Sequence, residues 1–203
     1  MCAPSSIRYH RGCPYFRSRL RHFVKPAFTL SSRLLLACSI LALLACSPKF
    51  NWREVRSKDA PYSVLLPAKP STFARPIDLD GTPLTMTMTA AKVDDTVFAV
   101  GSAVVPDAAK AQAALTAMKT ALVKNINGTV RAEKATAAAG GTQGLSASID
   151  VEAVGTTPGG KPEILYGHFV SKDKEIYQVI VMGPEKAVSR ENAETFISSF
   201  KHD

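Results

Sequence analysis

This 203-residue chain has no cysteine after residue 46 and no acidic residue before it. Three of the four cysteines lie before residue 46, so the chain from Cys46 onward has one thiol and cannot form a disulfide within itself. The first 45 residues contain seven Lys and Arg residues and no Asp or Glu, so they carry almost all of the net charge of +8. The remainder is nearly neutral, which argues against a nucleic-acid-binding body, because such domains have a basic surface of their own.

A long transmembrane segment is also lacking near the N-terminus. The apolar run Leu34–Ala45 has twelve residues, of which only Ser39 is clearly polar, and Lys25 and Arg33 precede it. As a helix it would span about 18 Å, well short of the ~30 Å hydrocarbon core of a bilayer. A basic flank followed by a short apolar run and small residues is typical of an export signal peptide.

The end of this run reads Leu43-Leu44-Ala45-Cys46 and resembles the lipobox of bacterial lipoproteins. The resemblance implies that Cys46 is the lipid-attachment site, that cleavage occurs before it, and that a fatty acid such as palmitate then acylates its new amine. Leu35–Cys38 spells the same four letters but follows Arg33 almost directly, which favours Cys46. The alternative is an uncleaved signal anchor in which Cys46 is a small buried residue.

By resemblance to lipoprotein sorting in Gram-negative bacteria, Ser47 after the lipidated cysteine favours the outer membrane. We therefore predict a lipid-anchored protein of the bacterial cell envelope that faces the periplasm. The predicted parts are a signal peptide over residues 1–45, a lipidated tether over 46–51 and a single α/β domain over 52–203. The leader is long and no Met occurs between Met1 and Met86, so a translation start near Val24 is an open alternative.

From Trp52 onward, apolar and polar residues mostly alternate, which is the period of a β-strand. Turn signals such as Asp80-Gly81 and Lys172–Lys174 separate the runs, so successive strands are expected to pair antiparallel. A flexible turn is predicted over 139–142. The predicted strands are 62–66, 84–90, 96–105, 129–137, 145–153, 164–171 and 175–182.

Two segments have the period of a helix instead. The first is expected to start at the N-cap Asp107 and to stop at Asn127-Gly128. The second is expected to begin near Glu185 or Ser189 and to end at Phe200. Both helices should lie on the sheet with one apolar stripe each, formed by Ala111, Leu115, Met118 and Leu122 and by Ala193, Phe196, Ile197 and Phe200.

This order of elements resembles the PsbP-like sandwich domains, which include small bacterial lipoproteins of the DcrB type. The segments that carry the resemblance are Tyr62–Pro67, Tyr177–Val181 and Phe196–Phe200, and it covers roughly residues 50–203. It implies an α+β fold with a mainly antiparallel sheet of six to eight strands and two helices packed on it. It also implies a protein that binds or stabilises partners rather than a catalyst.

One motif has the spacing of a phosphate-binding loop. Gly155–Lys161 matches G-x-x-x-x-G-K, but Pro162 stands where a hydroxyl would bind Mg²⁺, and the residues after it favour a strand. Without a helix N-terminus facing the loop, the phosphate site lacks its main feature. We interpret the segment as a glycine-rich hairpin loop.

Acid–base chemistry has few candidate residues. A Ser-His-Asp relay in the predicted mature chain would have to use His168, since His202 is next to last. Asp150 and Glu152 are expected on one strand face about 7 Å apart, where a solvated polar face explains them. A packed or half-exposed His168 is the simpler interpretation, and no catalytic residue is predicted.

Met86 and Met88 form the one pattern with a metal chemistry, because thioethers suit Cu(I). Alternation with threonines puts both sulfurs on the inward face, where methionine usually fills a core. We therefore predict no metal and no cofactor.

The resulting prediction is a non-enzymatic, lipid-anchored module that binds an envelope protein partner or assists assembly. The alternative is a binder of a small apolar or lipid-like ligand between the sheet and the terminal helix. An enzyme that uses Asp or Glu side chains also stays open at this point.

Overall fold

Antiparallel strands make up most of the described chain, which is residues 49–141 and 144–202 of a computed structural model. These residues belong to one unit that runs from Pro48 to Asp203. The predicted signal peptide and Cys46 lie outside the described residues.

A large sheet has seven strands in the order β3-β4-β5-β9-β8-β7-β6, and all neighbouring strands are antiparallel. A small antiparallel sheet has the order β1-β2-β10. The large sheet contains β3 (Ser71–Leu79), β4 (Thr82–Val93), β5 (Thr96–Val104), β6 (Thr129–Gly141), β7 (Gly144–Thr156), β8 (Pro162–Lys172) and β9 (Glu175–Pro184). The small sheet contains β1 (Arg53–Arg56), β2 (Tyr62–Leu66) and β10 (Lys201–His202).

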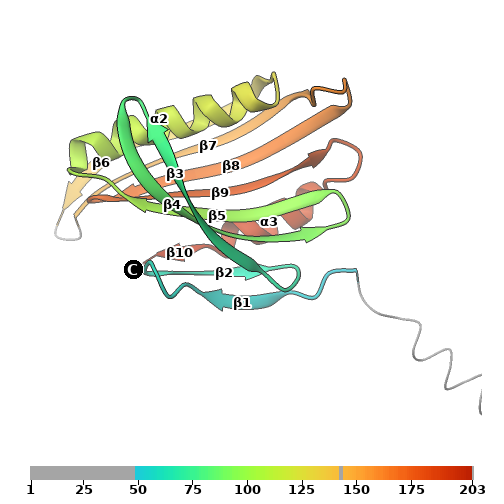
Figure 1. The fold of residues 1–203 in the computed structure, drawn as a ribbon, viewed down its shortest axis with the longest axis horizontal. Coiled ribbons are helices and arrows are strands. Elements are labelled where there is room, and N and C mark those ends of the chain that lie inside the picture. Colours follow the sequence, from blue (N-terminus) through green and yellow to red (C-terminus); the bar gives the residue numbers. More distant parts are fainter. Residues whose placement is uncertain (1–48, 142–143, 203) are drawn as a thin grey trace, which may run out of the picture. The chain divides into compact units, whose positions relative to one another are not determined.

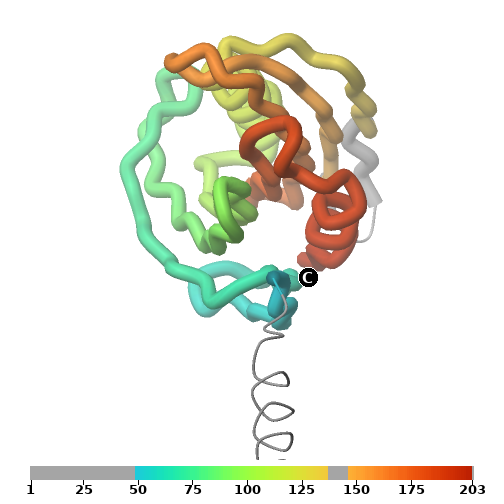
Figure 2. The backbone as a smooth tube through the Cα atoms, turned by 90° about the vertical axis from the view of Figure 1, so that its right-hand side faces the viewer, coloured from blue at the N-terminus to red at the C-terminus, as the bar shows by residue number. Residues whose placement is uncertain are grey.

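The two helices lie on opposite faces of the large sheet (Figure 1). Helix α2 (Ala108–Asn125) packs on β7, β8 and β9, and it also contacts both edge strands, β3 and β6. Helix α3 (Arg190–Ser198) lies on the other face together with β2. Figure 2 views the strands nearly end-on and shows how strongly the large sheet is curved. The prediction of an α+β fold with two helices on a mainly antiparallel sheet is confirmed.

Alternation along the strands gives the sheet two apolar faces and therefore two cores. On β9, Ile176 and Ile180 face α2, whereas Tyr177, Val179 and Val181 face α3. The three middle strands, β5, β9 and β8, contribute residues to both cores and are thus buried on both sides, which explains their long apolar runs.

The hairpin turns contain the residues that their backbone requires. Asp80 and Gly81 have φ values of 53° and 78°, as both central residues of a type I′ turn must. The Asp78 carboxylate accepts a 2.7 Å hydrogen bond from the Gly81 amide and holds this turn. Asp94 and Asp173 have φ values of 50° and 52° in the next two tight turns. The turns at Asp80-Gly81 and Lys172–Lys174 were predicted.

Helix α2 begins as predicted, with the Asp107 carboxylate accepting a 2.8 Å hydrogen bond from the Lys110 amide. Helix α3 begins at Arg190 after the N-cap Ser189, so a start at Glu185 is wrong. The helix also ends at Ser198, before Phe200, because Lys201–His202 pairs with β2 as β10.

The predicted turn over 139–142 is also wrong for Ala139–Gly141. These residues continue β6 and pair with Ser146, Leu145 and Gly144. The ladder satisfies their backbone groups, and a register shift between Thr136 and Ala139 accommodates the strand. Strand β3 and the small sheet have no counterpart among the predicted strands, apart from β2.

Candidate functional site

The face of the large sheet toward α3 is only partly covered. Helix α3 and the small sheet cover the middle strands, and a groove of about 400 Å³ remains between α3 and strands β6, β7 and β8. We call it the α3 groove. Its lining includes Lys134, Asp150, Glu152, Tyr166, Arg190 and Glu194.

Strand alternation places these polar side chains. Ile149 and Val151 pack in the core under α2, so Asp150 and Glu152 point to the opposite face, as predicted. The register then brings Lys134 of β6 and His168 of β8 to either side of Asp150. One row across three strands therefore carries a cation, a carboxylate and an imidazole.

Asp150 and His168 form a pair that sequence reasoning did not foresee. His168 Nδ1 and Asp150 Oδ1 lie 2.6 Å apart, with the side chains 23% and 50% exposed. The His168 ring also meets Phe200 at 6.4 Å between ring centres, so the ring is held on two sides. His168 is partly buried and packed against Phe200, in line with the packed or half-exposed histidine that we predicted. Within residues 49–141 and 144–202, no hydrogen bond joins this ring to a serine or threonine hydroxyl.

A second ion pair, between Arg190 and Glu152, lies on the α3 side of the groove. The Arg190 guanidinium donates to the Glu152 carboxylate and lies over the Tyr166 ring, 5.3 Å from its centre. Burial raises the pKa of the Tyr166 phenol, the Glu152 charge raises it further, and Arg190 partly opposes this. The hydrogen bond to Glu152 raises the pKa of Arg190 in turn.

Neither Arg190 nor Tyr166 was identified from the sequence. They meet only because α3 folds back over β8, and no local pattern predicts that approach.

The charges of the α3 groove are therefore mixed and largely paired. Arg131, in a bulge of β6, forms a 2.8 Å ion pair with Glu185 beyond the groove. Lys134 is exposed at the outer wall. The groove thus offers donors and acceptors in fixed positions together with one aromatic ring.

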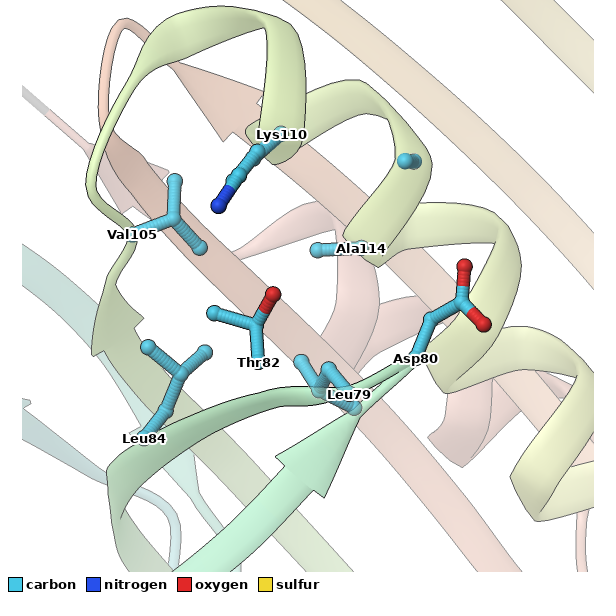
Figure 3. Close-up of a pocket in the computed structure, with 8 residues that line it drawn as sticks. Leu79, Asp80, Thr82, Leu84, Val105, Lys110 and Ala114 are labelled. Carbon is cyan, nitrogen blue, oxygen red and sulfur yellow. The ribbon is translucent and has the colours of Figure 1, made fainter.

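A smaller pocket of about 170 Å³ lies between the β3–β4 hairpin and the first turns of α2 (Figure 3). Leu79, Leu84, Val105 and Ala114 give it apolar walls, and the Lys110 side chain projects toward it. The carboxylate of Asp80 lies at its other side.

Aromatic side chains fill the space between the middle strands of the large sheet, the small sheet and α3. Phe98 and Phe196 meet edge to face at 5.5 Å, and Tyr177 contacts Tyr62 and Phe200 at 5.9 and 5.5 Å. Phe98, Phe196 and Tyr177 are each at most 1% exposed. These side chains occupy the middle of the region predicted for a lipid-like ligand, and the open space between the sheet and α3 is the α3 groove.

Met86 and Met88 are 2% and 6% exposed in the core under α2, as the alternation predicted. The Met88 sulfur accepts a hydrogen bond of 3.4 Å from the Gln178 side-chain amide. No group of three or more His, Cys, Asp or Glu residues suited to a metal ion occurs in the described part of the chain.

The phosphate-loop motif is a hairpin loop in the structure. β7 ends at Thr156 and β8 begins at Pro162, so the loop connects two antiparallel strands. Gly155 packs against the backbone at the end of α2: a Cβ there would lie 2.0 Å from the Ile126 carbonyl oxygen.

Neither helix of the described residues is long and apolar enough to cross a bilayer.

Comparison with known proteins finds similarity among solved structures alone. No family model matches the chain, and no curated protein matches it. The chain is similar to the solution structure of the cyanobacterial PsbP (CyanoP) from Synechocystis sp. PCC 6803, with a TM-score of 0.46 and 9% sequence identity. The similarity covers 78% of this chain and 96% of that one. It concerns the arrangement of the backbone and assigns no role to any residue.

Proposed function

We propose that this protein is a lipid-anchored, non-enzymatic module of the bacterial cell envelope that binds a protein partner through the α3 groove. The anchor is Cys46, at the end of the lipobox-like Leu43–Cys46. The periplasmic side of the outer membrane is the proposed location, on the basis of Ser47.

The observation that supports partner binding is the composition of the groove. Charged side chains and the Tyr166 ring lie in an open hollow on a part of the sheet face that no other element of the described chain covers. Arg and Tyr are enriched among the residues that contribute most to protein–protein binding, and here Arg190 lies on Tyr166.

Pairing within the groove supports the same function. Glu152 and Asp150 hold Arg190 and His168 in place before any partner arrives. Less side-chain entropy is then lost on binding, which favours affinity. Lys134 is exposed and the Asp150 side chain is half-exposed, so both are available to form ion pairs with opposite charges on the partner.

Cross-linking in intact envelopes tests this proposal. A photo-reactive amino acid at Ala132, which lines the groove, is expected to capture a defined protein, whereas the same group at exposed Thr116 on α2 is not. Lys134→Glu should weaken the cross-link from Ala132, and the matched change Lys124→Glu on α2 should not. Equal capture from both positions, or none from Ala132, would contradict the groove as the binding site.

A further inference from the structure

The folded body begins only three residues after the proposed lipid attachment site. Lys49 Nζ forms a 2.6 Å ion pair with Asp94, and the Phe50 ring stacks on Trp52 at 5.8 Å between centres. The Asn51 amide donates a 2.8 Å hydrogen bond to the Pro67 carbonyl. Three residue steps from Cys46 to Lys49 reach at most about 11 Å. A lipid on Cys46 would therefore hold the neighbourhood of Lys49 at the membrane surface.

This neighbourhood has more cations than carboxylates. It comprises exposed residues around the start of β1, the β2–β3 connection and the β4–β5 turn, which we call the anchor-proximal surface: Lys49, Arg53, Lys69, Lys92, Asp94 and Asp95. Lys49 neutralises Asp94, and Lys92 lies 3.6 Å from Asp95. Arg53 and Lys69 remain as positive charge. Anionic lipid headgroups attract such residues by about 1 kcal/mol each.

At the opposite end of the molecule, carboxylates outnumber cations. β4 runs twelve residues from the β3–β4 hairpin to Val93 beside Asp94, a length of about 40 Å. Figure 1 shows that hairpin and the β4–β5 connection at opposite ends of the strands. Five carboxylates lie at the hairpin end against three cations: Asp78, Asp80, the N-cap Asp107, Asp173 and Glu175 against Lys110, Lys172 and Lys174. Anionic headgroups would repel this end.

From the short tether and this asymmetry of charge, we propose that the anchor-proximal surface lies against anionic phospholipid headgroups, so that the Asp80–Gly81 hairpin points away from the bilayer. The inference rests on the proposed lipid anchor at Cys46. It adds the orientation of the body and the surface that meets the lipid.

Fluorescence quenching on vesicles tests this orientation. Mature lipidated protein, purified from envelopes, is placed on vesicles of phosphatidylethanolamine and phosphatidylglycerol that contain a headgroup-nitroxide lipid. A fluorophore is attached at Asn51→Cys, near the anchor, or at Ala113→Cys, which is exposed beside the hairpin. We expect quenching at position 51 to exceed that at position 113 several-fold. Equal quenching, or the reverse order, would overturn the proposal.

Charge variants test the headgroup contact. Arg53→Glu and Lys69→Glu each replace a positive charge by a negative one, so each should weaken surface contact by roughly 30-fold and lower the quenching at position 51. Lys110→Glu at the far end is the matched control and should leave it unchanged. If the two charge reversals near the anchor have no effect on vesicles with phosphatidylglycerol, the headgroup contact is refuted.

Two further measurements separate the orientation from the anchor. Protein that fails to float with vesicles would refute the lipid anchor and the orientation together. Protein that floats but shows equal quenching would refute the orientation alone. A ten-residue Gly-Ser insertion after Ser47 should reduce the contrast between positions 51 and 113, and an unchanged contrast would contradict the role of the short tether.

Discussion

Replacing Gly155 by alanine puts a methyl group where the end of α2 crosses β7. The new Cβ would lie 2.0 Å from the Ile126 carbonyl oxygen and 2.8 Å from the Gly128 Cα. Both are backbone atoms, so no side-chain rotation can relieve the contact. The α2 end must move away from the sheet by more than 1 Å to reach a normal van der Waals distance.

That movement has a cost that can be worked out. It breaks the 2.7 Å hydrogen bond from the Thr156 amide to the Ile126 carbonyl and displaces the Ile126 side chain, which is 2% exposed. Overpacking and the lost hydrogen bond together predict a loss of about 2–4 kcal/mol in the free energy of unfolding. For a domain of this size the melting temperature should fall by about 5–15 °C.

The assay is urea and thermal unfolding followed by the fluorescence of Trp52, the only tryptophan in the chain. Gly159→Ala is the matched control from the same motif, because a Cβ there would meet only Thr157 Oγ1 at 3.7 Å. The control should unfold within about 1 kcal/mol of the wild type. Wild-type stability in Gly155→Ala would refute the packing role of this glycine, and stabilisation of the wild type by a nucleotide would refute the interpretation of the motif as a simple hairpin loop.

Three other predictions follow from the cores and the groove. Phe196→Ala removes a fully buried ring from the aromatic core and should lower the free energy of unfolding by about 3–5 kcal/mol, measured in urea. Glu152→Gln removes a charge that raises the pKa of Tyr166, so the Tyr166 phenol should ionise at lower pH in an ultraviolet titration of the variant. The unfolded phenol ionises before the folded one, so the wild type should lose stability above about pH 10. The variant should lose less stability in this pH range. Met86→Leu should cost less than about 1.5 kcal/mol, and a Cu(I) titration against a competing chromophore should show no binding to the wild type.

Local chemistry explains why much of the fold was predictable. Asp80-Gly81 has the side chains that a type I′ turn tolerates, and Asp107 fits a helix N-cap, so these boundaries follow from a few residues. Strand β3 was not found because it is an edge strand whose first six residues are exposed. Its sequence therefore lacks the apolar alternation, and it contains Pro76, which is acceptable at a sheet edge.

The site was predictable only along single strands. Alternation placed Asp150 and Glu152 on one face, but their partners come from other elements. The Asp150–His168 pair depends on the register of β7 and β8, which the length of the Thr157–Lys161 loop sets. The approach of Arg190 depends on how α3 packs on β8, and long-range packing leaves no local pattern in the sequence.

The proposal that the body is tethered by lipid on Cys46 is tested most directly by mass spectrometry of the N-terminal peptide of protein purified from envelopes. We predict a peptide that begins at Cys46 and carries the mass of a diacylglyceryl group with a further acyl chain. A peptide that begins upstream of Cys46, or an unmodified Cys46, would contradict the account.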